Sequence, residues 1–216
     1  MKRRTLALGL LTELAGCSIL PERPPLKLYT LLANLNTQDC RAPKRRLSSV
    51  RINSPMIASP YDSTRCYVLT KDNRIYNTDI NRFSSNPGNL IGDGLREVIQ
   101  DCGPWNVVLS PNSISTPAYQ LTVFVSKFFI NAVKKPFAAV VEMEVSVVAS
   151  VSGKLVFHET YSQTQNTPTD DMPGAVSAFD VCLENIFKTL TNDLNKQATR
   201  TVSYTHLRAH ETEADL

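Results

Sequence analysis

Hydrophobic and polar residues alternate along two stretches in the second half of the chain. At 119–126 and 141–149, apolar side chains occupy every second position, and residues such as Thr122 and Glu144 separate them. A period of two residues is typical of a strand with one buried face and one face in water. Weaker apolar runs predict further strands at 26–32, 47–53, 65–70, 74–77, 105–109 and 155–161.

Two other stretches have the period of about 3.6 residues that is typical of an amphipathic helix. The first predicted helix has Asn86 as its N-cap, Pro87 at its first position and apolar residues that recur as far as Cys102. The second spans 175–195, and Cys182 lies beside its apolar stripe. The order of strands, helix, strands and helix predicts one α+β domain of two layers, in which both amphipathic helices pack on one face of a mostly antiparallel sheet.

Few residues point to catalysis or cofactor binding. Gly92 and Gly94 lie inside the first predicted helix without the lysine of a phosphate-binding loop, so we interpret them as sites of close packing. His158 and Glu159 are neighbours on a strand and point to opposite faces, which does not suit an acid–base pair. Asp170–Asp171 precedes the last helix, where negative charge stabilises the helix dipole. We therefore expect no catalytic, cofactor-binding or metal-binding residues.

The first residues are typical of an export signal. Lys2 to Arg4 supply positive charge, and the apolar stretch 5–14 is far shorter than the roughly 20 residues of a membrane-spanning helix. Leu14-Ala15-Gly16-Cys17 follows and resembles the bacterial lipobox, in which the cysteine becomes the lipidated first residue of the mature chain. We therefore expect a signal peptide over 1–16 and a lipid anchor on Cys17. An ordinary cleaved signal with a chance cysteine is the alternative.

The residues after Cys17 indicate where the protein is held. Ser18, in place of aspartate, favours the outer membrane under the sorting habit of enterobacteria-like cells. Prolines make 17–25 an extended spacer, which would hold the following domain, 26–200, off the membrane and in the periplasm. A lipid-modified N-terminal cysteine gives firm attachment, because several acyl chains act together.

The last residues, 201–216, differ from the rest of the chain. Residues 202–212 look like the translated read-through of a sequencing adapter, so we set 201–216 aside as a non-native tail. His206 and His210 have the i, i+4 spacing of helical metal ligands, but in such a tail we assign them no role. Without them His158 is the only histidine, which leaves little basis for a histidine-dependent active site.

Composition and charge fit a folded domain and argue against a nucleic-acid partner. The 216 residues are 42% hydrophobic and 20% charged, as in an ordinary globular protein. The formal net charge is only +3, so the chain lacks the strongly basic character of proteins that bind phosphate backbones.

Besides Cys17, the chain has four cysteines: Cys40, Cys66, Cys102 and Cys182. In an exported protein an even number of cysteines indicates disulfides, and four cysteines allow three connectivities. We favour Cys40–Cys66, which flank an early strand, and Cys102–Cys182, which lie on the predicted helices. Four buried free thiols are the alternative.

Phe128 and Phe129 stand side by side on a predicted strand. Because neighbouring side chains of a strand point to opposite faces, one ring should meet a second surface, a partner or a lipid. Lys134 and Lys135, at the following turn, would attract anionic headgroups or an acidic partner. A bulge or strand end that buries both rings is the alternative.

With the lipobox, the spacer and the element order, two short strands complete a resemblance to a known family. Tyr29-Thr30-Leu31 and Arg74-Ile75-Tyr76, within 17–195, resemble the ABC-type transport auxiliary lipoproteins of the PqiC-like group. That resemblance implies a non-enzymatic outer-membrane lipoprotein that assists an ABC/MCE-type phospholipid transport system. The implied partner is an MCE-domain protein, and a homo-oligomer is a further candidate assembly.

Two other functions stay open at this point. One is an accessory lipoprotein of lipopolysaccharide assembly or peptidoglycan synthesis, because such proteins also use small α+β domains. The other is a periplasmic hydrolase, which would require a polar cleft with paired titratable groups.

Overall fold

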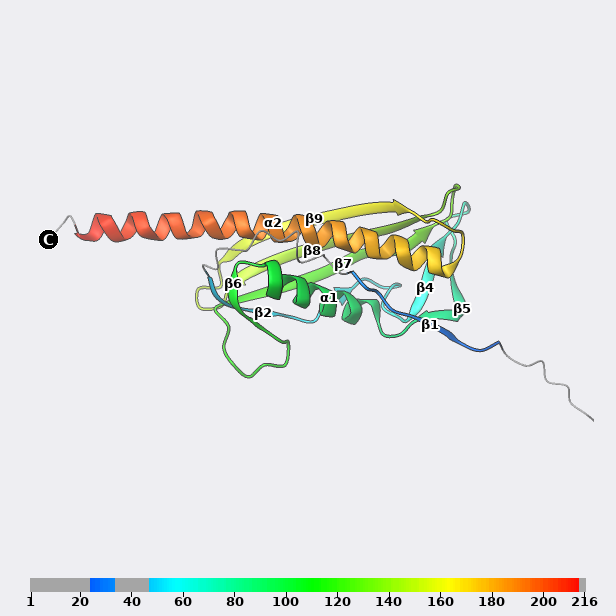
Figure 1. Ribbon diagram of the computed structural model, residues 1–216, viewed down its shortest axis with the longest axis horizontal. Helices are drawn as coiled ribbons and strands as arrows, with labels where there is room; N and C mark the ends of the chain where they lie inside the picture. Colours follow the sequence, from blue (N-terminus) through cyan, green and yellow to red (C-terminus); the bar gives the residue numbers. More distant parts are fainter. Residues whose placement is uncertain (1–23, 34–46, 214–216) are drawn as a thin grey trace, which may run out of the picture.

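The computed structural model describes residues 24–33 and 47–213, with side chains described as far as Arg200 (Figure 1). Strands come first, and each helix follows a group of strands, as the sequence predicts. In chain order the elements are β1 (Lys27–Tyr29), β2 (Leu47–Ile52), β3 (Met56–Ile57), β4 (Arg65–Leu69), β5 (Ile75–Phe83), α1 (Pro87–Cys102), β6 (Trp105–Leu109), β7 (Tyr119–Asn131), β8 (Ala138–Ala149), β9 (Leu155–Asn166) and α2 (Met172–Glu213).

The sheet is built around β7. Along one edge β7 pairs antiparallel with β8, and β8 pairs antiparallel with β9. Along its other edge β7 runs parallel to β2, β3 and β4 in turn. β5 pairs antiparallel with β4, while β1 and β6 run parallel to β5 and to β2.

The α+β class is therefore confirmed, with a sheet that is mixed. Its two longest ladders are antiparallel, whereas five shorter ones are parallel. Parallel pairing requires a crossover instead of a hairpin, so these pairs join strands that are distant in sequence. The hydrophobic period shows which face of a strand is buried, but it does not show in which direction the neighbouring strand runs.

Both helices cover the same face of the sheet, side by side (Figure 1). Asn195 Nδ2 of α2 donates a hydrogen bond of 2.8 Å to the carbonyl of Cys102, at the end of α1. A Cβ added to Gly94 would lie 3.5 Å from the Phe187 ring. In both contacts the residue of α2 follows the residue of α1 by 93 positions. The two helices therefore run in the same direction. α2 continues past the predicted end and extends beyond the sheet (Figure 1).

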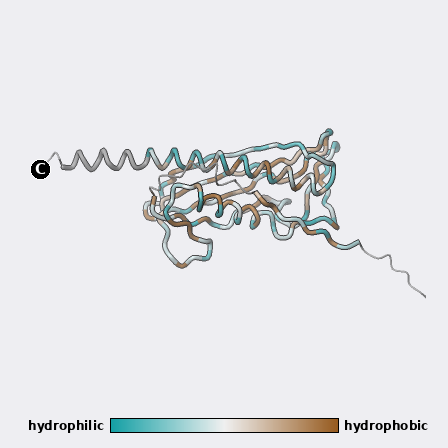
Figure 2. Tube along the Cα trace, viewed as in Figure 1, coloured by the Kyte–Doolittle hydropathy of each residue, from teal (hydrophilic) through white to brown (hydrophobic). Residues whose placement is uncertain are grey.

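The core lies between the helices and the sheet. Figure 2 shows hydrophobic residues along the strands and hydrophilic residues at the turns. At its centre Phe128 of β7 stacks on Phe179 of α2, and Phe83 of β5 packs against both rings. All three rings are almost completely buried, so they join the sheet to α2.

A bulge in β7 sets which side chains reach this core. The pairing with β8 shifts between Val125 and Lys127, so Ser126 is an extra residue. Before the bulge Val125 points inward, and after it Phe128 does. The bulge therefore changes the phase of the alternation and directs Phe128, in place of Phe129, into the core.

Candidate functional site

One end of the domain brings together three segments that are distant in sequence. These are the β4–β5 turn (70–74), the β7–β8 turn (132–137) and the segment 167–171 that leads into α2. The amide of Ala132 donates to the carbonyl of Leu69 at 2.8 Å, which joins the first two segments. We call this the cavity end; the loop 110–118 and the β8–β9 turn (150–154) lie at the far end (Figure 1).

A cavity of about 220 Å³ opens at the cavity end, between the sheet and the start of α2. Apolar residues line part of it: Val68, Ile130, Phe137, Met172 and Ala175. Polar residues line the rest: Thr78, Asn81, Thr167, Thr169, Asp170 and Asp171. Typical small-molecule sites measure about 300–1,000 Å³. The cavity therefore suits one segment of an amphipathic ligand.

The two carboxylates at this cavity already have partners. Asp171 Oδ1 accepts hydrogen bonds from the Thr169 hydroxyl and from the amide of Gly174, at 3.0 Å, which caps α2. These hydrogen bonds, that of Thr169 first, lower the pKa of Asp171. Asp170 Oδ2 forms an ion pair of 2.6 Å with Lys135 Nζ. The interpretation of Asp170–Asp171 as charge at a helix N-terminus is confirmed for Asp171.

Lys134 and Lys135 lie where the sequence places them, on the exposed β7–β8 turn. Lys135 Nζ, besides its ion pair with Asp170, lies 5.5 Å from the centre of the Phe137 ring. Lys134 forms no ion pair among the described residues. The exposed Lys135 pair contributes at most about 1 kcal/mol to stability, so both ammonium groups can meet an anionic partner.

Phe128 and Phe129 point to opposite faces, as the sequence predicts. Phe128 is buried in the core, which removes it from the candidates for contact with a partner. Phe129 lies on the outer face of the sheet, where it stacks on Tyr61 with ring centroids 5.8 Å apart. On the same outer face, Phe124 of β7 is 39% exposed, and its neighbour in the ladder, Met56, is 63% exposed. We call Met56, Tyr61, Phe124 and Phe129 the outer patch.

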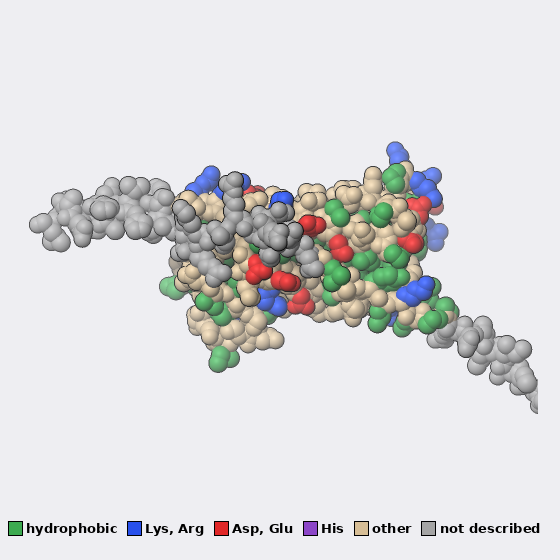
Figure 3. All heavy atoms as spheres, viewed as in Figure 1, with side chains coloured by type: hydrophobic (Ala, Val, Ile, Leu, Met, Phe, Trp, Pro, Cys, Tyr) green, Lys and Arg blue, Asp and Glu red, His purple; other side chains and the backbone are tan. Residues whose placement is uncertain are grey.

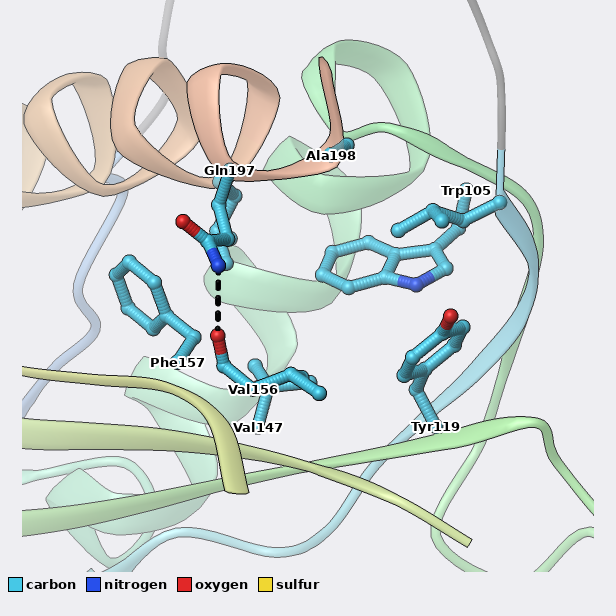
Figure 4. Close-up of a pocket in the computed structure, with 9 residues that line it drawn as sticks. Trp105, Tyr119, Val147, Val156, Phe157, Gln197 and Ala198 are labelled. Carbon is cyan, nitrogen blue, oxygen red and sulfur yellow. Dashed lines mark hydrogen bonds between the residues drawn. The ribbon is translucent and has the colours of Figure 1, made fainter. Parts of the chain in front are cut away.

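A second, much smaller pocket lies near the far end. Figure 4 shows the rings of Trp105, Tyr119 and Phe157 around it, with Gln197 of α2 donating to the carbonyl of Val156 at 3.1 Å. Its volume of about 20 Å³ has room for roughly one water molecule. Trp105 Nε1 is buried there without a hydrogen-bond partner among the described atoms. This pocket is too small for a substrate.

His158 lies on the exposed outer face of β9 and does not form a catalytic relay. Its Nδ1 is 3.0 Å from the Ser146 hydroxyl and 3.8 Å from a carboxylate oxygen of Glu144. A relay requires the acid and the hydroxyl at different ring nitrogens. Here the Ser146 hydroxyl and the Glu144 carboxylate both lie near Nδ1 of His158. The three side chains therefore form polar contacts on the surface.

The predicted disulfide pairs are wrong. Cys66 and Cys182 are free, buried thiols, so neither Cys40–Cys66 nor Cys102–Cys182 is formed. Cys66 faces the core from β4, and Cys182 Sγ lies 3.7 Å from the carbonyl of Ala139. Cys102 lies beside Asn195, thirteen residues or about 20 Å along α2 from Cys182, since a helix rises about 1.5 Å per residue. Cys102 is disulfide-bonded, and its partner is outside the described residues, as are Cys17 and Cys40.

The described residues form neither a cluster of metal ligands nor a membrane-spanning helix. No three of their histidine, cysteine and acidic side chains are grouped as a metal site would require. None of the described helices is long and apolar enough to cross a membrane. The side chains of His206 and His210 lie beyond the last described one.

Solved structures include several with the same fold. Protein XCC0632 from Xanthomonas campestris (family model DUF330) superposes with a TM-score of 0.69 at 16% identity, covering 82% of this chain and 99% of that one. An uncharacterised protein superposes with a TM-score of 0.63 at 12% identity, covering 79% and 99%. The hypothetical protein CT253 from Chlamydia trachomatis gives 0.51 at 6% identity, covering 70% and 98%. Identities this low show a shared fold alone.

Comparison of the sequence with protein families gives the identity of the domain. No significant match was found among curated proteins. One family model matches residues 29–191, from the end of β1 well into α2, and its description is an ABC-type transport auxiliary lipoprotein component. This range covers most of the chain and confirms the resemblance suggested by Tyr29-Thr30-Leu31 and Arg74-Ile75-Tyr76. The chain belongs to the family of ABC-type transport auxiliary lipoproteins.

Proposed function

We propose that this protein is a lipid-anchored, non-enzymatic subunit that assists an ABC/MCE-type phospholipid transport system at the outer membrane. The family match over 29–191 carries the proposal, because the family consists of lipoproteins that serve ABC-type transport. Cys17 and Ser18 of the sequence support an anchor sorted to the outer membrane, with the domain in the periplasm. The description of the family names neither a partner nor a cargo. The MCE-domain partner and the phospholipid cargo are therefore the parts of this proposal that go beyond it.

The cavity end supports contact with lipid. A lining that is part apolar and part polar suits an amphipathic molecule better than a water-soluble metabolite. Lys134 and Lys135 lie on the turn beside it and are our candidates for contact with anionic headgroups.

The outer patch supports contact with a protein partner. Met56 and Phe124 are exposed apolar side chains on a sheet face that neither helix covers. Exposed apolar residues that cluster on a folded domain mark interaction sites. We therefore place the contact with the MCE-domain protein on this patch, which includes Phe129 from the predicted set.

The partner can be identified by affinity purification of the full chain from detergent-solubilised membranes. We expect an MCE-domain protein to co-purify together with an ABC ATPase and a permease. Phe124→Ser should reduce the recovered partner several-fold, whereas Val151→Ser, at an exposed far-end position, should not. Recovery of a lipopolysaccharide-assembly or peptidoglycan-synthesis protein in its place would show that the proposed system is wrong.

A homo-oligomer is part of the same proposal. β9 pairs only with β8 among the described strands, so most backbone groups along its other edge have no strand partner there, although the carbonyl of Val156 accepts from Gln197. An edge this long invites pairing with another chain. Light scattering of the purified full chain should give a mass above that of one protomer, and a monomer over the whole accessible concentration range would exclude this part.

A further inference from the structure

Exposed leucines stand at the point where the described chain begins. Leu26 is 58% exposed and Leu28 of β1 is 63% exposed. The parallel pairing of β1 with β5 places Leu28 beside Arg82, and alternation puts Leu26 on the same face as Leu28. Phe83, in contrast, points into the core. Leu26 and Leu28 therefore form one apolar surface, which we call the β1–β5 edge.

Basic side chains flank these leucines. Lys27 lies between Leu26 and Leu28 in sequence, and alternation turns its side chain to the face of its partner Asn81, whereas Arg82 lies beside Leu28 on the face of the leucines. Neither basic residue forms an ion pair within the described part of the chain. Arg82 Nε donates only to the backbone carbonyl of Asp79, whose exposed carboxylate is the acidic group nearest in sequence. Figure 3 shows hydrophobic and basic side chains together where the N-terminal segment reaches the domain.

The position of the edge limits what can cover it. Leu26 follows Cys17 by nine positions, and a fully extended chain of that length spans about 30 Å. The far-end turn at Val151 follows β8, whose twelve residues span about 40 Å from the cavity end. A lipid anchor on Cys17 would therefore hold the β1–β5 edge, the first part of the described domain after the anchor, within about 30 Å of the bilayer.

From these observations we infer that the β1–β5 edge docks onto the surface of the membrane that holds the lipid anchor. Leu26 and Leu28 enter the boundary between headgroups and acyl chains, while Arg82 contacts anionic headgroups. This inference rests on the proposed lipid anchor and changes one expectation from the sequence. The proline-rich spacer then does not hold the domain away from the membrane.

The test measures fluorescence quenching in vesicles. The full lipidated chain carrying Leu28→Trp is incorporated into phosphatidylethanolamine–phosphatidylglycerol vesicles that contain doxyl-labelled lipid. The introduced indole should lose about half of its fluorescence, because an interfacial apolar side chain is buried roughly 5–10 Å deep. Leu26→Trp is the second variant. The native Trp105, buried in the β6 region, gives the background in the unsubstituted protein.

Val151→Trp is the matched control, because this residue is exposed at the far end and should not be quenched. Arg82→Glu should reduce quenching of Leu28→Trp in anionic vesicles and leave flotation unchanged. If the chain floats with the vesicles but neither Leu26→Trp nor Leu28→Trp is quenched, the spacer holds the domain off the membrane and the inference is wrong. If the chain does not float at all, the lipid anchor and the proposed function are wrong as well.

Discussion

The rings of Phe128 and Phe179 stack face to face, with centroids 4.1 Å apart and planes inclined by 14°. This contact joins the middle of the sheet to the first half of α2 and exists because the bulge at Ser126 turns Phe128 inward. The neighbouring Phe129 contributes to the outer patch. Alternation divides this aromatic pair between the two faces of the sheet, and one extra residue in β7 decides that Phe128, and not Phe129, enters the core.

Phe128→Ala should lower the free energy of unfolding by about 3–5 kcal/mol, because it removes a buried aromatic ring and leaves a cavity. Phe129→Ala, the matched control, should cost less than half as much, since its ring is partly exposed and stacks only on Tyr61. Urea denaturation of both variants measures the difference. Equal losses would mean that Phe129 is as much a core residue as Phe128.

Gly92 and Gly94 should respond oppositely to substitution by alanine. A methyl group on Gly92 would lie 2.7 Å from Cδ of Pro55, so Gly92→Ala should destabilise the protein despite the higher helix propensity of alanine. On Gly94 the same group would meet the Phe187 ring at an ordinary 3.5 Å, so Gly94→Ala should stabilise it by about 0.5–1 kcal/mol. Thermal unfolding of both variants tests this. A stabilised Gly92→Ala variant would contradict the close packing of α1 on Pro55.

The cysteines should divide into two classes by reactivity. Burial raises the pKa of Cys66 to about 12 and that of Cys182 to about 11, so neither thiol should be alkylated in the folded protein at neutral pH. Lipidation would occupy the sulfur of Cys17, and we therefore propose Cys40 as the partner of Cys102. Under denaturing conditions without reductant, alkylation should label Cys66 and Cys182 alone.

Breaking that proposed bond should weaken the fold. Cys40→Ser should lower the free energy of unfolding by about 2–5 kcal/mol, because a cross-link over so long a loop restricts the unfolded chain. It should also make Cys102 available to alkylation in the unfolded protein. If all four thiols of the mature domain are labelled without reductant in the natural protein, the bond is absent.

Asp180 should make stability depend on pH. Burial raises the pKa of its carboxyl, while the hydrogen bond from the amide of Leu32, at 2.8 Å, acts in the opposite direction. The folded state therefore binds this proton more tightly than the unfolded chain, whose aspartate titrates near pH ~3.9. The resulting stabilisation is complete below that pH and is lost as the pH rises through the higher folded pKa.

Asp180→Asn keeps an oxygen that accepts from Leu32 and removes the charge. The variant should therefore gain stability relative to the natural protein as the pH rises from about 4 towards 7. Urea denaturation across this range measures the gain. Parallel curves for the two proteins would show that Asp180 does not titrate differently on folding.

Much of the fold could be predicted from local patterns. The N-cap at Asn86, which accepts from the amide of Gly88, and the helix to Cys102 were predicted correctly, as were the long strands from 119 and 141. The opposite directions of Phe128 and Phe129 followed from the alternation alone. The outer patch was missed beyond Phe129, although the alternation of 119–126 also places Phe124 on the outer face.

The state of the cysteines and the position of the cavity could not be predicted from local patterns. Cys66 and Cys182 both lie on apolar faces, as expected for Cys182, but both a free thiol and a disulfide can lie on an apolar face. The cavity joins Val68, Ile130 and Met172, which belong to three elements far apart in sequence. No spacing within one element could indicate their meeting.

Local features of the chain were enough to predict the helices and strands, their buried faces and the family, while the signal and lipobox at the N-terminus stay a prediction. These depend on periodicity, capping and short motifs, which neighbouring residues set among themselves. The parallel ladders, the free thiols, the cavity and the exposed β1–β5 edge were decided only when the chain folded. Each of them depends on which distant residues come into contact, and side-chain periodicity carries no information about that choice.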